Sequence, residues 1–500
     1  MINIKYYPIL FCLAYSAIAL TLGLFLTQSG SGISPDSIMY ISSADNLHQG
    51  NGLGALVYAA PLYPILITGV IFLGFSAIEA ARLVPIICFT LLMFPVFYLG
   101  KALGSSFIGY IACLICLVLT PILMLASFSW TEMPYILFSV TGVLFLVKFT
   151  QSGKSTTLCI AAVFIALAFA TRYVGVSLII AGLAIVMIKN RSQLKRALLQ
   201  SSLFGILSCL PMLPWIYWNT VRFGSFGGYT YDWGKIYGKG VGLYDNLYYM
   251  TGAIVNSLFG VSSSISLNIQ WLAPVAAVVL VLLVLYRTTD IKYKKALQQY
   301  LHENYAAIIC IVIYLLAILL LRTYWHEKNV YSRYITVIYP LLIATILSLL
   351  LYIYRQTQGF TSRRVILSVL VIVCVCFTAI HINSSLSFYA VAKEGQIYTA
   401  SEWRNNEGLA WIEANADSEA TVYANNTYPP RLRLENEIKA FPRSGNVTLF
   451  LEGLESGSYV VCFKVKGYEA IPPYTEVMDA NSDSLVLVAE FEDSVIWQVK

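Results

Sequence analysis

Long apolar runs alternate with short polar segments over most of the chain. A helix needs roughly 20 apolar residues to cross a bilayer, and somewhat fewer when its flanking side chains reach the interface. Eleven runs approach this length, which predicts an all-α polytopic membrane protein. They are residues 6–27, 82–100, 107–127, 134–150, 157–171, 174–188, 197–217, 271–286, 305–321, 335–354 and 365–381.

One further run, 61–76 (PLYPILITGVIFLGFS), is short and holds two prolines and two glycines. The positive-inside rule decides whether this run spans the membrane. If it is a juxtamembrane helix and the N-terminus is cytoplasmic, the three basic clusters of the chain all face the cytoplasm. Counted as a span, it would send all of them outside. These clusters are Lys189/Arg191/Lys195/Arg196, Arg287/Lys292/Lys294/Lys295 and Arg355/Arg363/Arg364.

The last hundred residues follow a different pattern. The segment 401–415 (SEWRNNEGLAWIEAN) spaces its apolar residues as a helix does. Short β-branched and aromatic runs, separated by Pro and Gly, predict strands at 421–425, 459–465, 485–491 and 495–499. We therefore expect a transmembrane domain over 1–385 and a small extracytoplasmic α/β domain over 386–500.

Composition and charge agree with this division. The chain is 58% hydrophobic and 12% charged, whereas globular domains are about 25% charged. Residues 396–500 hold 16 acids and 8 bases, a net charge of −8. Because the overall net charge is +6, residues 1–395 carry +14. Since membrane topology explains the bases, we expect the partners to be membrane lipids and not nucleic acid.

This topology places five segments on the outer face of what we expect to be the inner (cell) membrane. They are a loop at 28–81, short links near 129–134 and 172, a long loop at 218–270, and 322–334. The 218–270 loop is rich in Gly, Tyr and Ser, as a lid over an active site would be.

Two carboxylates stand in the first outer segment, Asp36 and Asp45, beside the candidate substrate contacts Tyr40 and Asn46. Asp36 follows Ser34 and Pro35, at a predicted helix start whose positive end favours an ionised carboxylate. Such a carboxylate near a bound hydroxyl can act as a general base. The alternative is that Asp36 only caps the helix.

Glu132 lies between two apolar runs, in SWTEMPY. A carboxylate there is costly unless it faces a wet cavity or a cation. Together with Asp36 it would suit a divalent cation, or a pair of acids in which one activates and the other orients. The alternative is a helix start in which Thr131 and Glu132 form a capping motif.

Three arginines lie close to apolar runs: Arg172 in FATRYVG, Arg333 in YSRYITVIYP, and Arg82. Arginine is costly there and binds phosphate through two parallel hydrogen bonds. With Arg172 and Arg333 on the outer face, a lipid phosphate is a natural ligand. The alternative is snorkelling to lipid headgroups, which suits Arg82 better than Arg172.

These segments together resemble the GT-C superfamily of membrane glycosyltransferases, specifically glycosyltransferase family 39, with its protein O-mannosyltransferases and aminoarabinose transferases. The resemblance runs over roughly residues 1–350. It is carried by PDSIMYISSADNLHQGNGL, PLYPILI, ARLVP, TEMPY, ATRYVG, LPWIYWNTVRFGS and SRYITVIYPLL.

The resemblance implies an inverting transfer of a sugar from a polyprenyl-phosphate carrier to an acceptor outside the membrane. By this resemblance Asp36 is the catalytic aspartate, Glu132 a second acid, and Arg172 and Arg333 hold the carrier phosphate. Tyr63 in PLYPILI and Arg82 in ARLVP are further candidate substrate contacts. Ser37 stands where many relatives have a second acid, which weakens any metal role at this point.

Two other classes of function are compatible with the pattern. In a transporter or flippase, Asp36, Glu132 and Arg172 would line a path. However, the acids lie in outer segments, and no repeat of two halves is visible. In an assembly protein, the acidic tail would bind a partner and the outer segments would have no chemistry.

Overall fold

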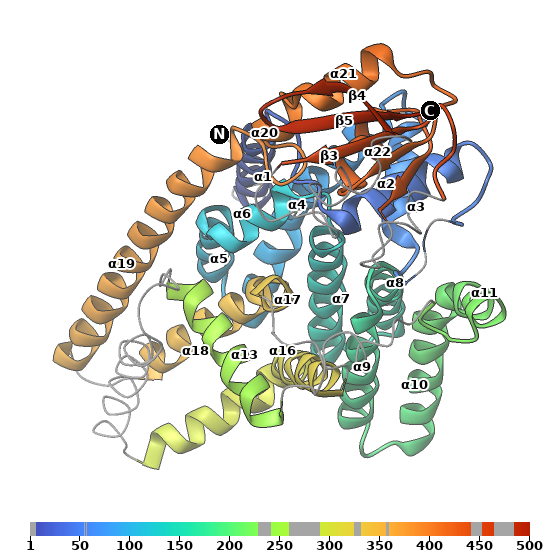
Figure 1. Ribbon diagram of the computed structural model, residues 1–500. Helices are drawn as coiled ribbons and strands as arrows, with labels where there is room; N and C mark the ends of the chain where they lie inside the picture. Colours follow the sequence, from blue (N-terminus) through green and yellow to red (C-terminus); the bar gives the residue numbers. More distant parts are fainter. Residues whose placement is uncertain are drawn as a thin grey trace. The chain divides into compact units, whose positions relative to one another are not determined.

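The computed structural model describes residues 7–54, 56, 58–228, 242–259, 291–324, 332–356, 360–441, 453–464 and 485–500 (Figure 1). The chain forms two compact units, each with its own interior. The helical unit comprises Met1–Gln28 and Tyr40–Lys393, and the sheet unit comprises Ser29–Met39 and Glu394–Lys500. The predicted span 271–286 and much of the predicted loop 218–270 lie outside the described residues.

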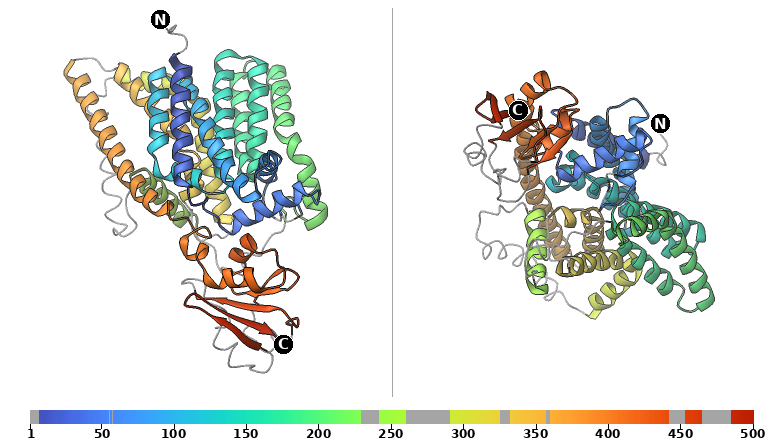
Figure 2. Two further views of the ribbon diagram at one scale, coloured as in Figure 1. Left: turned by 90° about the horizontal axis from the view of Figure 1, so that it is seen from above. Right: turned by 45° about the vertical axis from the view of Figure 1, so that its right-hand side comes forward.

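The helical unit is built almost entirely of α-helices. Helix α7 packs against α4 and α8, while α10 packs against α8 and α9, and the teal to green helices lie side by side in Figure 2. Its helices are α1 (Tyr7–Leu26), α2 (Pro35–His48, which begins in the sheet unit), α3 (Leu62–Ile71), α4 (Ala77–Leu103), α5 (Ser106–Val118), α6 (Thr120–Ser127), α7 (Glu132–Ser152), α8 (Ser155–Thr171), η2 (Tyr173–Gly175), α9 (Val176–Lys189), α10 (Leu194–Cys209), η3 (Leu210–Met212), α11 (Leu213–Phe223), α13 (Leu243–Phe259), α16 (Ile291–Tyr324), α17 (Ser332–Thr336), α18 (Tyr339–Gln356) and α19 (Phe360–Ala392).

Among the described residues, six helical segments are long and apolar enough to span a membrane, or seven if a bent pair is counted as one span. This count is lower than the predicted eleven. The runs at 157–171 and 174–188 form shorter apolar helices, and 271–286 is not described. The six segments are Tyr7–Leu26, Ala77–Leu103, Glu132–Ser152, Leu194–Phe223, Leu297–Thr323 and Tyr339–Gln356.

The bent pair replaces a straight span predicted at 107–127. Helices α5 and α6 meet at an angle of 63°. Leu119 between them is extended, and Pro121 stands in the first turn of α6. Because proline has no N–H to donate, it starts a helix more readily than it continues one. The run 61–76 contains the ten-residue helix α3, as predicted.

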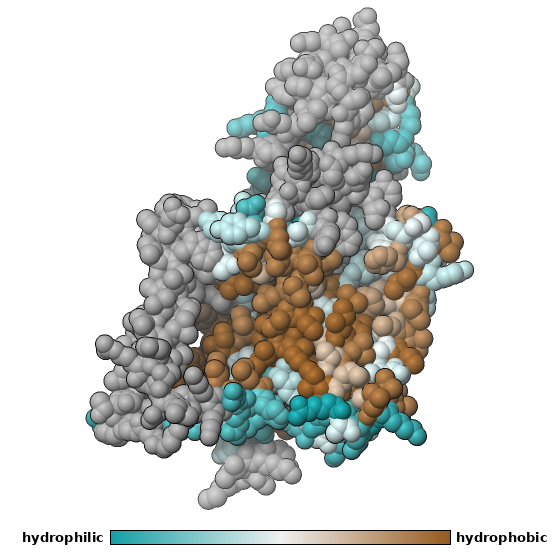
Figure 3. Space-filling model, turned by 90° about the horizontal axis from the view of Figure 1, so that it is seen from below, coloured by the Kyte–Doolittle hydropathy of each residue, from teal (hydrophilic) through white to brown (hydrophobic). Residues whose placement is uncertain are grey.

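The surface of the helical unit is that of a multi-pass membrane protein. A broad apolar band is bordered by polar side chains on the face seen in Figure 3. Helix α1 alone exposes Leu10, Phe11, Leu13 and Ile18. A soluble monomer rarely exposes so large a continuous apolar patch, so this band faces lipid.

The sheet unit holds a mixed five-stranded sheet among its described residues, with strand order β2-β1-β3-β5-β4. Strand β1 pairs in parallel with β2 and β3, whereas β5 pairs antiparallel with β3 and β4. The strands are β1 (Val422–Ala424), β2 (Ile438–Ala440), β3 (Tyr459–Phe463), β4 (Leu485–Glu490) and β5 (Ser494–Val499).

The predicted α/β character of the tail is therefore confirmed, with three local differences. The helix predicted at 401–415 is two helices, α20 (Ser401–Arg404) and α21 (Glu407–Asn415). They separate because Asn406 caps α21 by accepting a hydrogen bond from the Leu409 N–H at 2.9 Å. Strand β2 and helix α22 (Tyr428–Arg433) were not predicted.

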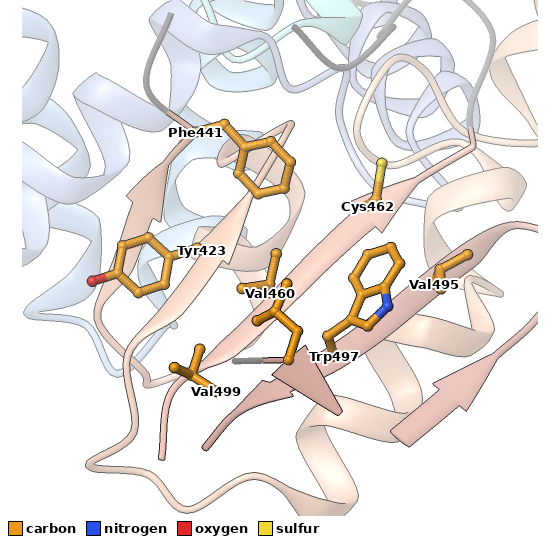
Figure 4. Close-up of a cluster of buried hydrophobic side chains, with 8 residues drawn as sticks. Tyr423, Phe441, Val460, Cys462, Val495, Trp497 and Val499 are labelled. Atoms are coloured by element: carbon orange, nitrogen blue, oxygen red, sulfur yellow. The ribbon is translucent and has the colours of Figure 1, made fainter. Parts of the chain in front are cut away.

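A hydrophobic core covers one face of this sheet (Figure 4). Val460 and Cys462 of the central strand β3 point into it, beside Trp497 of β5. All five residues of β3 are buried, so both faces of the central strand are covered. Along the chain, the helical unit ends at Lys393, one residue after the end of α19.

Candidate active site

Glu132 is the first residue of α7 and is 1% exposed. Within the described residues, Thr131 makes no side-chain cap for this helix. Its hydroxyl accepts a hydrogen bond from Arg172 Nη1 at 2.7 Å and lies 3.4 Å from Glu132 Oε2. The side chains of Thr131 and Glu132 are thus turned toward a cation, which argues against the capping alternative.

Arg172 reaches Glu132 from the end of the neighbouring helix α8. Its Nη1 atom lies 2.7 Å from Glu132 Oε1. Arg172 is extended, and η2 turns the chain back directly after it. That turn requires glycine at position 175, because a Cβ there would lie 2.6 Å from the Phe169 Cα atom. The tight turn therefore sets where Arg172 points.

A second guanidinium approaches the same carboxylate. Arg333 Nε, on the short helix α17, lies 3.7 Å from Glu132 Oε1. The Arg333 guanidinium also lies 5.0 Å from the centre of the Trp130 ring. Such stacking on an aromatic face is favourable for arginine and holds its plane.

Tyr334 joins these arginines to a third. The guanidinium carbons of Arg172, Arg322 and Arg333 lie 5.2, 4.2 and 5.0 Å from its ring centre. Arg322 stands near the end of the long helix α16 and is 7% exposed. Tyr314 of the same helix donates a hydrogen bond to the Tyr334 carbonyl at 2.6 Å. We call Glu132, Arg172, Arg322, Arg333 and Tyr334 the arginine cluster.

The charges of the cluster shift the pKa values of its own members. Burial alone would lower the pKa of Arg172, but its charge interactions, of which the one with the Glu132 carboxylate is the largest, together outweigh burial and raise it. Burial alone would raise the pKa of Tyr334, but the three guanidiniums outweigh burial and lower it. Of the three guanidiniums in the cluster, those of Arg172 and Arg333 lie 2.7 and 3.7 Å from the Glu132 carboxylate, and that of Arg322 lies over the Tyr334 ring.

A hydrogen-bond network ties the neighbouring loops to the same turn. The Tyr173 hydroxyl accepts from Trp215 Nε1 at 3.0 Å and from Asn219 Nδ2 at 3.1 Å. It donates to the Ala59 carbonyl at 3.3 Å. Helix α11 and the chain before α3 are therefore fixed to the residue that follows Arg172.

Asp36 belongs to the sheet unit and occupies the second position of α2. The cap is made by other residues: the Ser37 N–H donates to Ser34 Oγ at 3.4 Å, and the Ser34 N–H donates to Ser37 Oγ at 3.0 Å. This reciprocal arrangement satisfies the helix start, so the carboxylate of Asp36 is not needed as the cap. Asp36 is half-buried.

The other predicted site residues have mainly packing partners. Tyr63 is fully buried, donates to the Ala81 carbonyl at 3.3 Å, and lies edge-on to Tyr40 with ring centres 5.2 Å apart. Arg82 pairs with Glu79 at 2.6 Å and donates to Thr27 Oγ1 at 2.9 Å. Its charge is therefore compensated within its own helix.

Asp45 and Asn46 lie on the second half of α2. Asp45 Oδ2 accepts a hydrogen bond from Gln49 Nε2 at 2.9 Å, and the Asn46 carbonyl accepts from the Asn51 N–H at 2.8 Å. Both residues are half-exposed. Both contacts are local hydrogen bonds near the end of α2.

The described residues do not suit the divalent cation suggested for Glu132. They contain no cluster of three or more His, Cys, Asp or Glu side chains that could hold a metal ion. Glu132 instead faces two guanidiniums, whose charge would repel a cation at that carboxylate.

The sequence pattern missed Arg322, Tyr334 and Tyr173. Arg322 directly follows the apolar run 305–321, where an arginine usually reaches toward lipid headgroups. A signal was nevertheless present, because Arg172 ends an apolar run in the same way. Tyr173 and Tyr334 directly follow the two predicted arginines, and in this aromatic-rich chain nothing set them apart.

The resemblance inferred from the sequence is confirmed by comparison with known proteins. Residues 59–218 match the family described as Dolichyl-phosphate-mannose-protein mannosyltransferase. No protein of curated function matches the chain in sequence.

The fold is similar to that of several solved structures. ArnT from Cupriavidus metallidurans, bound to undecaprenyl phosphate, superposes with a TM-score of 0.61 at 13% identity, covering 97% of each chain. The oligosaccharyltransferase AglB from Archaeoglobus fulgidus, in complex with an inhibitory peptide and a dolichol-phosphate, gives 0.54 at 14% identity over 92% of this chain and 70% of that one. The mycobacterial arabinofuranosyltransferase AftD gives 0.51 at 13% identity over 97% and 41%.

Proposed function

We propose that this chain, similar to the dolichyl-phosphate-mannose-protein mannosyltransferases over residues 59–218, is an inverting membrane glycosyltransferase. It moves a sugar from a polyprenyl-phosphate carrier to an acceptor at the outer face of the membrane. The observation that carries the proposal is the arginine cluster, in which three guanidiniums surround the Tyr334 ring and two of them share the Glu132 carboxylate.

The charge of the cluster suits a lipid-linked phosphate. Guanidinium groups bind phosphate oxygens through strong, paired hydrogen bonds. Arg172 and Arg322 lie at the ends of the apolar helices α8 and α16. A lipid headgroup at the membrane surface can reach them there. Two of the solved relatives contain undecaprenyl phosphate and dolichol-phosphate, which supports a carrier of this class.

The chemistry requires one base and a site for the leaving group. The donor is a phosphodiester with one negative charge. As the acceptor oxygen forms its bond to the anomeric carbon, the bond from that carbon to the phosphate oxygen breaks. The carrier leaves as a phosphate with two negative charges, which the arginine cluster stabilises. Asp36 accepts the proton of the acceptor hydroxyl.

Glu132 has a positioning role in this scheme. It holds Arg172 and Arg333 on one side of the cluster, 2.7 and 3.7 Å from the same oxygen. Fixed donors of this kind stabilise developing charge without reorganising during the reaction. With the outer-face orientation predicted from the Lys and Arg clusters, the site and the sheet unit belong on the extracytoplasmic side.

The proposal is tested by reconstituting the protein in vesicles with labelled polyprenyl-phosphate sugars. We expect cleavage of the sugar–phosphate bond. We expect Asp36→Asn to lower its rate by about 10²- to 10⁴-fold while carrier binding is kept. Asp245→Asn, which changes an exposed carboxylate of another outer segment, is the matched control and should be active.

Two outcomes would contradict this proposal. A normal rate for Asp36→Asn would exclude Asp36 as the base. Movement of the intact donor across the bilayer, with no cleavage of the bond in any variant, would favour the transporter alternative.

A further inference from the structure

The segment that carries Asp36 is attached to the C-terminal part of the chain. Ser29–Met39 clusters with Glu394–Lys500 and not with the rest of the N-terminal residues. Ile33 forms a parallel β-bridge with Ile397, and the Tyr398 N–H donates to the Ile33 carbonyl at 3.2 Å. The Thr399 hydroxyl lies 2.8 Å from the Ser31 carbonyl and donates to it.

The turn that receives this segment is tightly built. Ile397 has a φ of 54°, and no other described residue apart from glycine has a positive φ. Gly395 has a φ of 93°, and a Cβ there would collide with the Thr399 carbonyl oxygen. Such a conformation persists only when surrounding contacts determine it. Thr399 supplies one of them, because its hydroxyl also accepts from the Gln396 N–H at 3.1 Å.

Aromatic contacts anchor the turn to the sheet. Tyr398 is buried, with its ring 5.6 Å from Tyr428 and 6.0 Å from Trp403. Trp403 in turn lies edge-on to Phe463 of the central strand β3, at 5.4 Å. The turn is therefore held by the interior of the sheet unit, because aromatic pairs of this geometry add to the free energy of burial.

Only two residues, Ser34 and Pro35, separate the anchored Ile33 from Asp36. Ser34 and Ser37 cap each other across this interval and start α2. The Ile38 N–H then donates to the Ser34 carbonyl at 3.1 Å, which forms the first turn of the helix. The position of Asp36 is thus tied to Ile33 by a short, hydrogen-bonded path.

We propose that the sheet unit positions the catalytic base, and that Thr399 is the positioning residue that joins the 395–399 turn to the segment bearing Asp36. This inference rests on the proposed function for the role of Asp36. It gives the C-terminal unit a task in the reaction even though it lies outside the matched family region, residues 59–218.

The first test is kinetic and uses Thr399→Val, which keeps the side-chain shape and removes the hydroxyl. A misplaced catalytic group costs up to about 10²-fold in rate. We therefore expect kcat to fall at least about tenfold while KM for the lipid-linked donor is unchanged. Thr399→Ser retains the hydroxyl and should restore the rate. A fall in Thr399→Ser equal to that in Thr399→Val would contradict a role for the hydrogen bond.

The second test does not depend on activity. Hydrogen–deuterium exchange of the full-length protein should be faster at 29–39 in Thr399→Val, with unchanged exchange in α7 and α8. Thr421→Val is the matched control, because Thr421 is also a partly enclosed donor of the sheet unit but bonds to Glu455 at 2.9 Å. It should leave exchange at 29–39 as in the wild type.

The two proposals fail in different ways. Unchanged exchange at 29–39 in Thr399→Val overturns the positioning role whatever the activity. Faster exchange in Thr399→Val, combined with full activity in Asp36→Asn, supports the attachment through Thr399 but refutes the assignment of Asp36 as the base.

Discussion

Replacing Glu132 with glutamine removes the one carboxylate of the arginine cluster while keeping its size. Glu132 is 1% exposed and touches two guanidiniums. Removing one partner of a buried ion pair costs about 3–5 kcal/mol, because the remaining charge is left buried without compensation. We expect the lower end of this range, since Arg172 still donates to Thr131 Oγ1 at 2.7 Å.

The matched control is Glu79→Gln. Glu79 also pairs with an arginine at 2.6 Å, but its side chain is 38% exposed. Exposed pairs contribute at most about 1 kcal/mol. Thermal unfolding of detergent-solubilised protein should therefore show a clearly lower Tm for Glu132→Gln and a nearly unchanged Tm for Glu79→Gln.

Added carrier provides a second measurement on the same variant. A ligand that binds the folded state raises the Tm, and at a given concentration a tighter ligand raises it more. Since Glu132 competes with a phosphate for Arg172 and Arg333, polyprenyl phosphate should stabilise Glu132→Gln more than the wild type. Equal Tm values for the two glutamine variants, or a smaller carrier effect in Glu132→Gln, would refute the reasoning.

Two further predictions concern the turn after Arg172. Tyr173→Phe removes the hydroxyl that accepts from Trp215 and Asn219. It should lower the free energy of unfolding, measured by chemical denaturation, by about 1–3 kcal/mol. Tyr217→Phe, on the exposed side of α11, should leave it unchanged. An equal effect of the two variants would argue against the network. Gly175→Ala places a methyl group against the Phe169 backbone and should displace Arg172. We therefore expect weaker carrier binding in a filter assay. Gly69→Ala, which has open space around its Cβ position, should bind the carrier normally. Tight binding by Gly175→Ala would show that the turn does not set the position of Arg172.

Much of the fold was predictable because the bilayer imposes a simple pattern. The predicted runs at 6–27 and 134–150 correspond to α1 and α7 within a few residues. The bend between α5 and α6 was missed because hydropathy averages over Pro121. Strand β2 was missed because it has only three residues and is recognised through its pairing with β1.

The candidate site was predictable as residues but not as an arrangement. The costs of burying Glu132 and Arg172 in apolar surroundings pointed to both residues. Their contact depends on the packing of α7 against α8, which brings together positions 40 residues apart. The pattern left open whether Asp36 only caps its helix, and the hydrogen bonds between Ser34 and Ser37 argue against that alternative.

The gathering of three guanidiniums around Tyr334 has a consequence for turnover. Guanidiniums attract a phosphate more strongly when it carries more negative charge. The spent carrier is a dianion, whereas the loaded donor carries one negative charge. We therefore expect the enzyme to hold its lipid product more tightly than its substrate, so that release of the empty carrier limits the steady-state rate and added free carrier inhibits.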